Sequence, residues 1–213
     1  MADVRTAFAE AAAYLVAVAE KIPEAAWDKP GLGEWNVREL VGHASRALIT
    51  VPAYLAEPAE RVDLPTAVDH YRRFASSGGA GGVDAAIAER GRQAAAALGD
   101  DPASSLRTLM ASAIVAVGEA PGGALVGTPF GGMRLSDYLQ TRIFELTVHG
   151  LDVVEATGVE ADPPRSAVAV TLHLAAELAA GSPQAGPLLL AMTGRGPLPP
   201  GFTILRTGGD HRA

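Results

Sequence analysis

Apolar residues that recur every three or four positions are the feature that most constrains the fold of this chain. The first such run comprises Val4, Phe8, Ala11, Leu15, Ala19 and Ile22. This spacing marks one face of an α-helix, and no alternating run longer than a few residues indicates a strand. The chain is 48% hydrophobic and 19% charged, which is typical of a folded protein. We therefore expect an all-α fold built as a helical bundle.

Helix-starting and helix-ending residues divide this pattern into segments. The first helix, over about 3–21, is closed by Pro23, and Asn36 with Glu39 forms a capping-box pair at the next start. The second helix is expected over 37 to about 49, where Pro52 ends or kinks it.

The rest of the chain predicts further helices and two less regular passages. The helices are expected over 66–76, 83–98, 106–117, 135–157, 164–180 and 185–193. Residues 121–132 read as a turn-rich passage, and 202–205 as a strand or an extended arm. The expected organisation is a helical bundle over 1–158, followed by a short, mostly helical extension over 159–213 that packs on it.

Composition excludes several classes of function. The net charge of −7 gives no support to nucleic-acid binding, and no apolar run approaches the roughly 20 residues that span a bilayer. The chain begins without the basic region and apolar block of a signal peptide, so a cytoplasmic location is expected. There is no cysteine, so any sulfur chemistry needs an outside thiol. The bundle is expected to be a monomer or a helix-packed homodimer.

A polar stripe marks the helix expected over 135–157. It consists of Tyr138, Arg142, Glu145, His149 and Asp152, which fall within an arc of roughly 80° on a helix. Apolar residues crowd against both sides of the stripe: Leu139, Phe144, Leu146, Val148, Leu151 and Val153. A solvated charged face has its apolar residues on the opposite side, so this pattern predicts a stripe that lines an interior cavity.

Glu145 and His149 lie one helical turn apart and can bind one metal ion together. Zn²⁺ usually takes three protein ligands, and the best third ligand is His43, at the edge of the apolar face of the second helix. Simpler interpretations stay open: a surface Glu–His pair, a core histidine at 43, and a pairing of Arg142 with Glu145 or Asp152. The ligand set suits Zn²⁺, Fe²⁺ or Ni²⁺.

Several segments carry a family resemblance. They are Trp-Asp-Lys-Pro at 27–30, Glu-Trp-Asn-Val-Arg-Glu-Leu-Val-Gly-His at 34–43, Thr-Pro-Phe-Gly-Gly at 128–132, Arg-Leu-Ser-Asp-Tyr-Leu at 134–139 and Arg-Ile-Phe-Glu-Leu-Thr-Val-His-Gly-Leu-Asp at 142–152. Together they resemble the mycothiol-dependent maleylpyruvate isomerase family of the DinB-like metalloenzyme superfamily.

The resemblance implies a DinB-like four-helix bundle with additional short helices and one divalent metal ion, usually zinc. It implies that His43, Glu145 and His149 are the metal ligands, and that Arg142 and Asp152 hold these ligands in place. Mycothiol is the implied co-substrate, and a small molecule is the substrate.

The expected chemistry starts from a thiol whose sulfur the metal activates as a nucleophile. An isomerase would add the thiolate to a double bond and later eliminate it, whereas a transferase would release the adduct. Two alternatives stay open: a non-catalytic bundle that binds a small ligand, and a metal hydrolase that uses metal-bound water.

Overall fold

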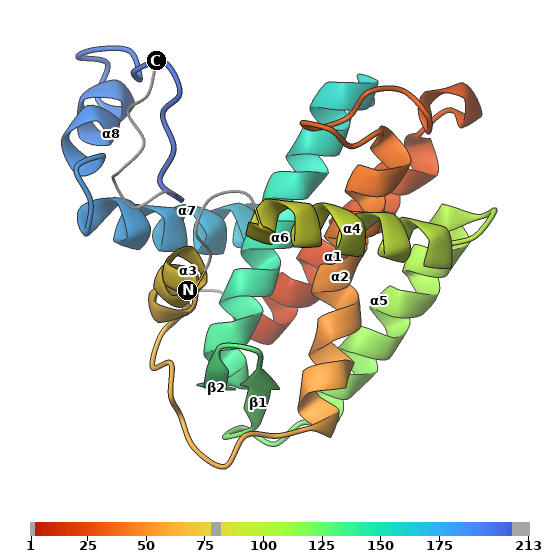
Figure 1. The fold of residues 1–213 in the computed structure, drawn as a ribbon, viewed down its shortest axis with the longest axis horizontal. Coiled ribbons are helices and arrows are strands. Elements are labelled where there is room, and N and C mark those ends of the chain that lie inside the picture. The colour runs from red at the N-terminus through yellow and green to blue at the C-terminus, as the bar shows by residue number, and fades with distance from the viewer. Residues whose placement is uncertain (1–2, 78–81, 206–213) are drawn as a thin grey trace.

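Four long helices form a bundle in the computed structural model, which describes residues 3–77 and 82–205. They are α1 (Val4–Lys21), α2 (Val37–Ala56), α5 (Pro102–Glu119) and α6 (Leu135–Thr157) (Figure 1). Each of α1 and α2 packs against both α5 and α6, and the main apolar core lies between the four helices. The expected all-α helical bundle is confirmed.

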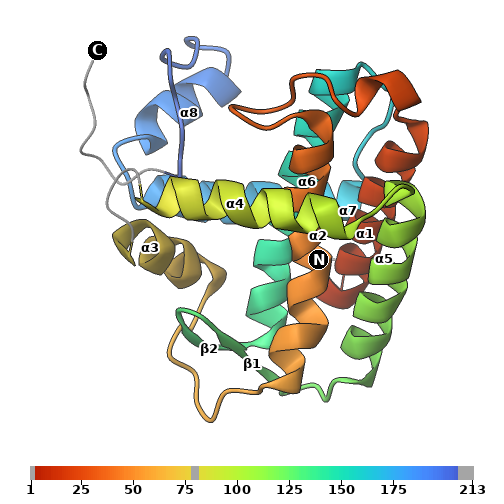
Figure 2. The same ribbon diagram turned by 45° about the vertical axis from the view of Figure 1, so that its right-hand side comes forward.

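Shorter helices surround this bundle. α4 (Gly82–Ala97) lies across α2 (Figure 2), and α3 (Ala67–Ser77) packs on α6 and α7. α7 (Arg165–Ala180) packs on α1 and α6, and α8 (Ala185–Met192) packs on α7. A short 3₁₀ helix, η1 (Glu24–Ala26), lies in the loop after α1. The division of the chain into units over 1–158 and 159–213 stays a prediction.

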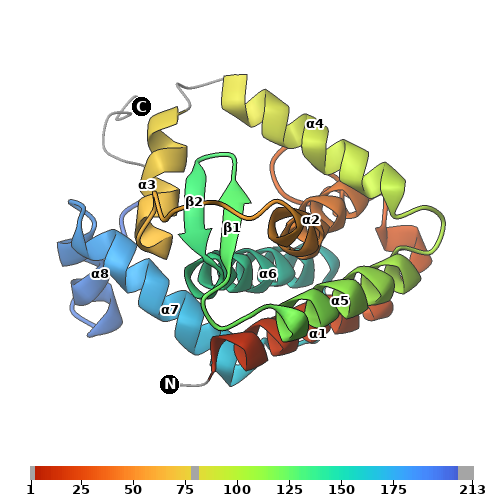
Figure 3. The same ribbon diagram turned by 90° about the horizontal axis from the view of Figure 1, so that it is seen from below.

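The turn-rich passage before α6 contains a β-hairpin that the sequence analysis did not expect. β1 (Leu125–Thr128) pairs antiparallel with β2 (Gly131–Arg134), with Thr128 opposite Gly131. The strand signal is weak because three of the eight strand residues are glycines. The connection from α2 to α3 crosses the hairpin (Figure 3), and the Gly132 carbonyl accepts hydrogen bonds from Asp63 and Leu64 in that connection. The hairpin thereby helps to hold α3 beside α6.

Two other expectations require correction. α2 continues to Ala56 with Pro52 inside it, because the residues around the proline are packed: Val51 is buried and the Tyr54 ring lies 5.6 Å from that of Tyr138. Of the two alternatives expected at 202–205, the strand does not form, and Ile204 of this segment packs against a second apolar cluster between α3, α6 and α7.

None of the helices in the described ranges has both the length and the apolar character needed to cross a membrane.

Candidate metal centre

The candidate centre lies where α2 and α6 run antiparallel. Near one end of their contact, the rings of His43 and His149 meet edge to face with centroids 4.8 Å apart. Further along, the Tyr138 hydroxyl donates a 2.6 Å hydrogen bond to Oγ1 of Thr50. Residues further along α2 therefore face residues earlier in α6, and the facing pairs are roughly one hundred positions apart in the sequence.

Glycines beside the two histidines allow close packing at this point. A Cβ atom added at Gly42 would overlap the backbone of Ala95 in α4, and one added at Gly150 would overlap the Tyr14 ring of α1. Each histidine is therefore held on a helix that a neighbouring helix approaches closely.

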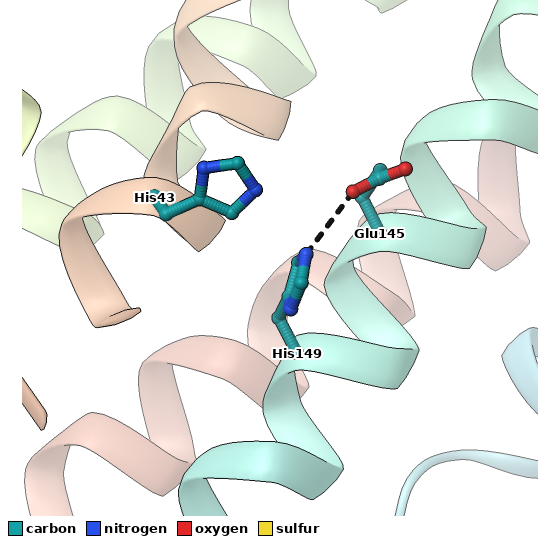
Figure 4. A group of neighbouring side chains, drawn as sticks. All are labelled: His43, Glu145 and His149. Atoms are coloured by element: carbon teal, nitrogen blue, oxygen red, sulfur yellow. Dashed lines mark ion pairs between the residues drawn. The ribbon is translucent and has the colours of Figure 1, made fainter. Parts of the chain in front are cut away.

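His43, Glu145 and His149 converge between the two helices (Figure 4). One potential ligand atom from each lies within 4.8 Å of the others. Nε2 of His149 lies 3.2 Å from Oε2 of Glu145, close to the roughly 3.4 Å that separates two ligand atoms around a tetrahedral Zn²⁺ ion. The donor set, two imidazoles and a carboxylate, fits a divalent metal.

Hydrogen bonds orient both ligand candidates on α6. Nδ1 of His149 lies 2.9 Å from Oδ2 of Asp152, and Oε1 of Glu145 accepts a 2.7 Å hydrogen bond from the Tyr71 hydroxyl of α3. The atoms left over, Nε2 of His149 and Oε2 of Glu145, face each other. Asp152 lies on the predicted stripe, whereas sequence reasoning missed Tyr71 because nothing in the pattern of α3 places it against α6.

The α2 side of the centre has a different environment. The His43 imidazole stacks on the Trp35 ring, with centroids 4.5 Å apart and planes 28° from parallel. Its Nδ1 is buried and has no hydrogen-bond partner among the residues that the structure describes. Ring contacts with Trp35 and His149, rather than hydrogen bonds, therefore position this imidazole among the described residues.

The two histidines of the centre have pKa values that are shifted in opposite directions. Burial disfavours charge on His149, but hydrogen bonds to Asp152 and Glu145 outweigh it and raise the pKa to about 9. Burial likewise disfavours the Glu145 carboxylate, yet the hydrogen bond and charge of His149 hold its pKa far below the usual range. For His43, burial and the nearby His149 charge lower the pKa to about 4. Without a metal ion, Glu145 and His149 therefore share a proton, and a bound cation would replace that proton. His43 is neutral.

Arg142 extends the predicted stripe but pairs with neither Glu145 nor Asp152 in the part of the chain described. Its guanidinium lies 4.8 Å from the centre of the Tyr138 ring, and its Nε donates to Oγ1 of Thr141. The ion pairs left open by the sequence do not form.

A comparison with protein families gives a match that covers most of the chain. The sequence model for the family described as the mycothiol maleylpyruvate isomerase N-terminal domain matches residues 8–154, more than half of the chain. The matched range runs from α1 to the last turn of α6 and includes His43, Glu145 and His149. No curated protein and no solved structure matches the chain significantly.

Proposed function

The chain belongs to the mycothiol maleylpyruvate isomerase N-terminal domain family, with a DinB-like helical fold, and we propose that it is a metal-dependent enzyme whose nucleophile is mycothiol. The observation that carries the proposal is the convergence of His43, Glu145 and His149 within 4.8 Å. These residues would hold one divalent ion, for which Zn²⁺ is the best candidate because two imidazoles and a carboxylate are common zinc ligands.

The protein has no thiol of its own, because the sequence contains no cysteine. When bound, the metal would supply a positive charge that favours the thiolate over the thiol at neutral pH, and the three protein ligands would leave a position open. A low-molecular-weight thiol from solution therefore supplies the sulfur. A cytoplasmic location would expose the protein to such thiols.

Asp152 and Tyr71 are positioning residues in this proposal. Asp152 accepts the proton on Nδ1 of His149, so Nε2 would be the nitrogen that binds the ion, which takes the place of the proton shared with Glu145. Tyr71 occupies Oε1 of Glu145 and leaves Oε2 free. Both hydrogen bonds exist without a bound ion, so less ordering remains to be done when the metal binds.

The same centre serves two reaction types. In an isomerase, the sulfur adds to an activated double bond of the small-molecule substrate, the bond rotates, and elimination restores the thiol. In an S-transferase, the sulfur displaces a leaving group from an electrophile and the thioether is released. His43, Glu145 and His149 would hold the metal ion in both reactions. We therefore propose a thiol-dependent metalloenzyme and do not choose between the two reactions.

Metal content and thiol binding test the proposal together. Elemental analysis of the untagged protein is expected to find close to one equivalent of Zn²⁺ or a similar ion. Calorimetric titration with mycothiol is expected to show binding that disappears in His149→Ala. Wild-type protein that stays metal-free after reconstitution would refute the proposal.

Activity without added thiol would favour the alternative of a metal hydrolase. Ligand binding that survives both metal removal and replacement of Glu145 would favour a non-catalytic binding bundle.

A further inference from the structure

One face of α4 lies against the part of the chain that carries His43 (Figure 2). Gly91 and Ala95 share this face, because residues four apart project side by side from a helix. Ala95 leaves no room for a side chain at Gly42, the neighbour of His43. Gly91 lies against the indole of Trp35, the ring on which His43 stacks. The same face of α4 therefore contacts the helix of this ligand at one point and the stacking partner of the ligand at another.

The contact between Gly91 and Trp35 is made over the face of the indole. A Cβ atom added at the buried Gly91 would lie 3.2 Å from Cε2, 3.2 Å from Cζ2 and 3.3 Å from Nε1 of Trp35. Three neighbouring ring atoms at nearly equal distances place such an atom above the ring plane and not beside its edge. These separations are shorter than the roughly 3.5–4.0 Å of an ordinary carbon–carbon contact, so a methyl group at position 91 would push the ring away.

Glycine is an unfavourable residue at this position on helix propensity alone. Gly91 lies in the interior of α4, where glycine is less stable than alanine because it loses more backbone entropy. The close approach of the Trp35 ring gives a physical reason for the glycine, since a residue without a Cβ atom lets the indole pack directly against the backbone of α4.

Among the residues that the structure describes, no hydrogen bond fixes the rotation of the Trp35 side chain. Its backbone is anchored: the Trp35 amide donates a 3.0 Å hydrogen bond to the Leu32 carbonyl, and the Trp35 carbonyl accepts a 2.8 Å hydrogen bond from the Gly31 amide. The indole Nε1, by contrast, is buried and has no partner in that part of the chain. The position of the ring therefore depends on its packing, which includes Gly91 on one helix and His43 on another.

We propose that Gly91 is a positioning residue of the candidate metal centre. It lets the Trp35 ring lie close to α4, and the ring in turn sets the position of the His43 imidazole. α4 thereby determines how well the ligand from α2 meets the two ligands from α6, although the candidate ligand set includes no residue of α4. The inference deepens the proposed function and rests on it for the presence of a metal ion.

The Zn²⁺ affinity of the full-length protein, measured by competition with a chromogenic chelator, tests this role. Gly91→Ala is expected to weaken binding about threefold and Gly91→Val about tenfold or more, since the larger side chain displaces the ring further. The urea midpoint of metal-free Gly91→Ala should stay close to that of the wild type, because the higher helix propensity of alanine offsets the crowding. Ala96→Gly, at an exposed position of α4, is the control: it should lower the urea midpoint but bind Zn²⁺ like the wild type.

Replacing the indole by a smaller ring should remove the effect. In a Trp35→Phe background there is more space beside position 91, so the addition of Gly91→Ala should change Zn²⁺ affinity little. Unchanged affinity in both single variants of Gly91 would overturn the positioning role. A loss of the same size in Ala96→Gly, or in the Trp35→Phe background, would overturn it as well. Should Gly91→Val fail to fold, Gly91→Ala and the double variant carry the test.

A measurement on metal-free protein separates this inference from the proposed function. The ring current of Trp35 acts on the Cε1 proton of His43, whose NMR signal is assigned by its loss in His43→Gln. Gly91→Ala is expected to shift this signal, while the signal of the exposed His173 stays in place. If the wild type binds no divalent ion, the proposed function fails, and the presence or absence of the shift decides the positioning role. An unchanged signal together with unchanged Zn²⁺ affinity would overturn the role of Gly91 and leave the proposed function standing.

Discussion

The two sides of the candidate centre are built differently. On α6, Glu145 and His149 contact each other, and each has a second hydrogen-bond partner, Tyr71 for one and Asp152 for the other. On α2, His43 stacks on Trp35 and its buried Nδ1 makes no hydrogen bond within the described part of the chain. One side is fixed by directional bonds and the other by packing.

This difference shows which parts of the fold determine the geometry of the centre. The α6 pair depends on local helix geometry, because residues four apart always project side by side. The third ligand depends on the position of a whole helix, so errors in packing would reach the centre mainly through His43. Changes on α6 should therefore alter the hydrogen bonds of the centre, whereas changes near His43 should alter its geometry.

The largest expected effect is on metal binding when one ligand is removed. His43→Ala and His149→Ala should each lower metal affinity by at least about 100-fold, more than loss of a ligand's hydrogen-bond partner costs. In metal-free protein the two should differ, because only His149→Ala removes the proton shared with Glu145. Its free energy of unfolding should fall by roughly 1–3 kcal/mol more than that of His43→Ala, as measured by urea denaturation. Unchanged metal affinity in His43→Ala would show that α2 does not contribute a ligand.

The next largest effect concerns the two close helix contacts. Gly42→Ala places a methyl group against the backbone of Ala95, which cannot rotate away, and should destabilise the protein by about 1–3 kcal/mol. The nearest atoms to the new methyl group in Gly150→Ala belong to the Tyr14 ring, a side chain that can shift, so this substitution should cost less. Thermal denaturation measures both. Equal or reversed losses would mean that α2 is no more tightly constrained than α6.

The sequence predicted the α6 side of the centre better than the α2 side for a physical reason. Glu145, His149 and Asp152 follow from helical periodicity alone, and the structure brings all three together. Position 43 followed from its place at the edge of an apolar face, but the Trp35 stack did not, because Trp35 precedes α2 in a loop. Tyr71 was missed because the long connection between α2 and α3, which crosses the hairpin, places α3 beside α6. The residue pattern of α3 does not reveal this placement.

Loss of Asp152 should weaken the α6 side without removing a ligand. Asp152→Asn keeps the size of the side chain but no longer offers a carboxylate to Nδ1 of His149. We expect metal affinity to fall about 10–100-fold, the usual cost of losing a hydrogen-bond partner of a metal-bound histidine. Competition with a chromogenic chelator measures this affinity. Asp162→Asn is the control, because it removes an exposed carboxylate that is not part of the centre; an equal loss there would contradict the role of Asp152.

The pH dependence of stability tests how tightly α3 covers the α6 side. His70 of α3 is buried against Phe130, Tyr71 and Tyr138, and burial together with the Arg142 charge lowers its pKa from 6.5 to about 4. The unfolded chain therefore binds the proton first, and stability falls as the pH drops from about 6.5 towards 4. The loss between pH 7.5 and pH 5 is about 2 kcal/mol.

His70→Phe should remove this part of the acid sensitivity, as measured by urea denaturation at the two pH values. His173→Phe, which replaces an exposed histidine of α7, should keep it. An unchanged difference between the two pH values in His70→Phe would mean that α3 opens readily and that His70 is protonated in the folded protein.

The smallest effect should distinguish the two sides most directly. Tyr71→Phe removes only the hydroxyl that donates to Glu145, whereas Trp35→Phe keeps an aromatic face against His43 and removes an indole N–H that has no partner in the described residues. We expect Tyr71→Phe to lower metal affinity about three- to tenfold, the net value of one ordinary hydrogen bond, and Trp35→Phe to change it less. The same chelator competition measures both. A larger loss of metal affinity in Trp35→Phe would contradict this expectation. It would mean that the stacking of His43 on Trp35 constrains the centre more than the hydrogen bond from Tyr71 to Glu145 does.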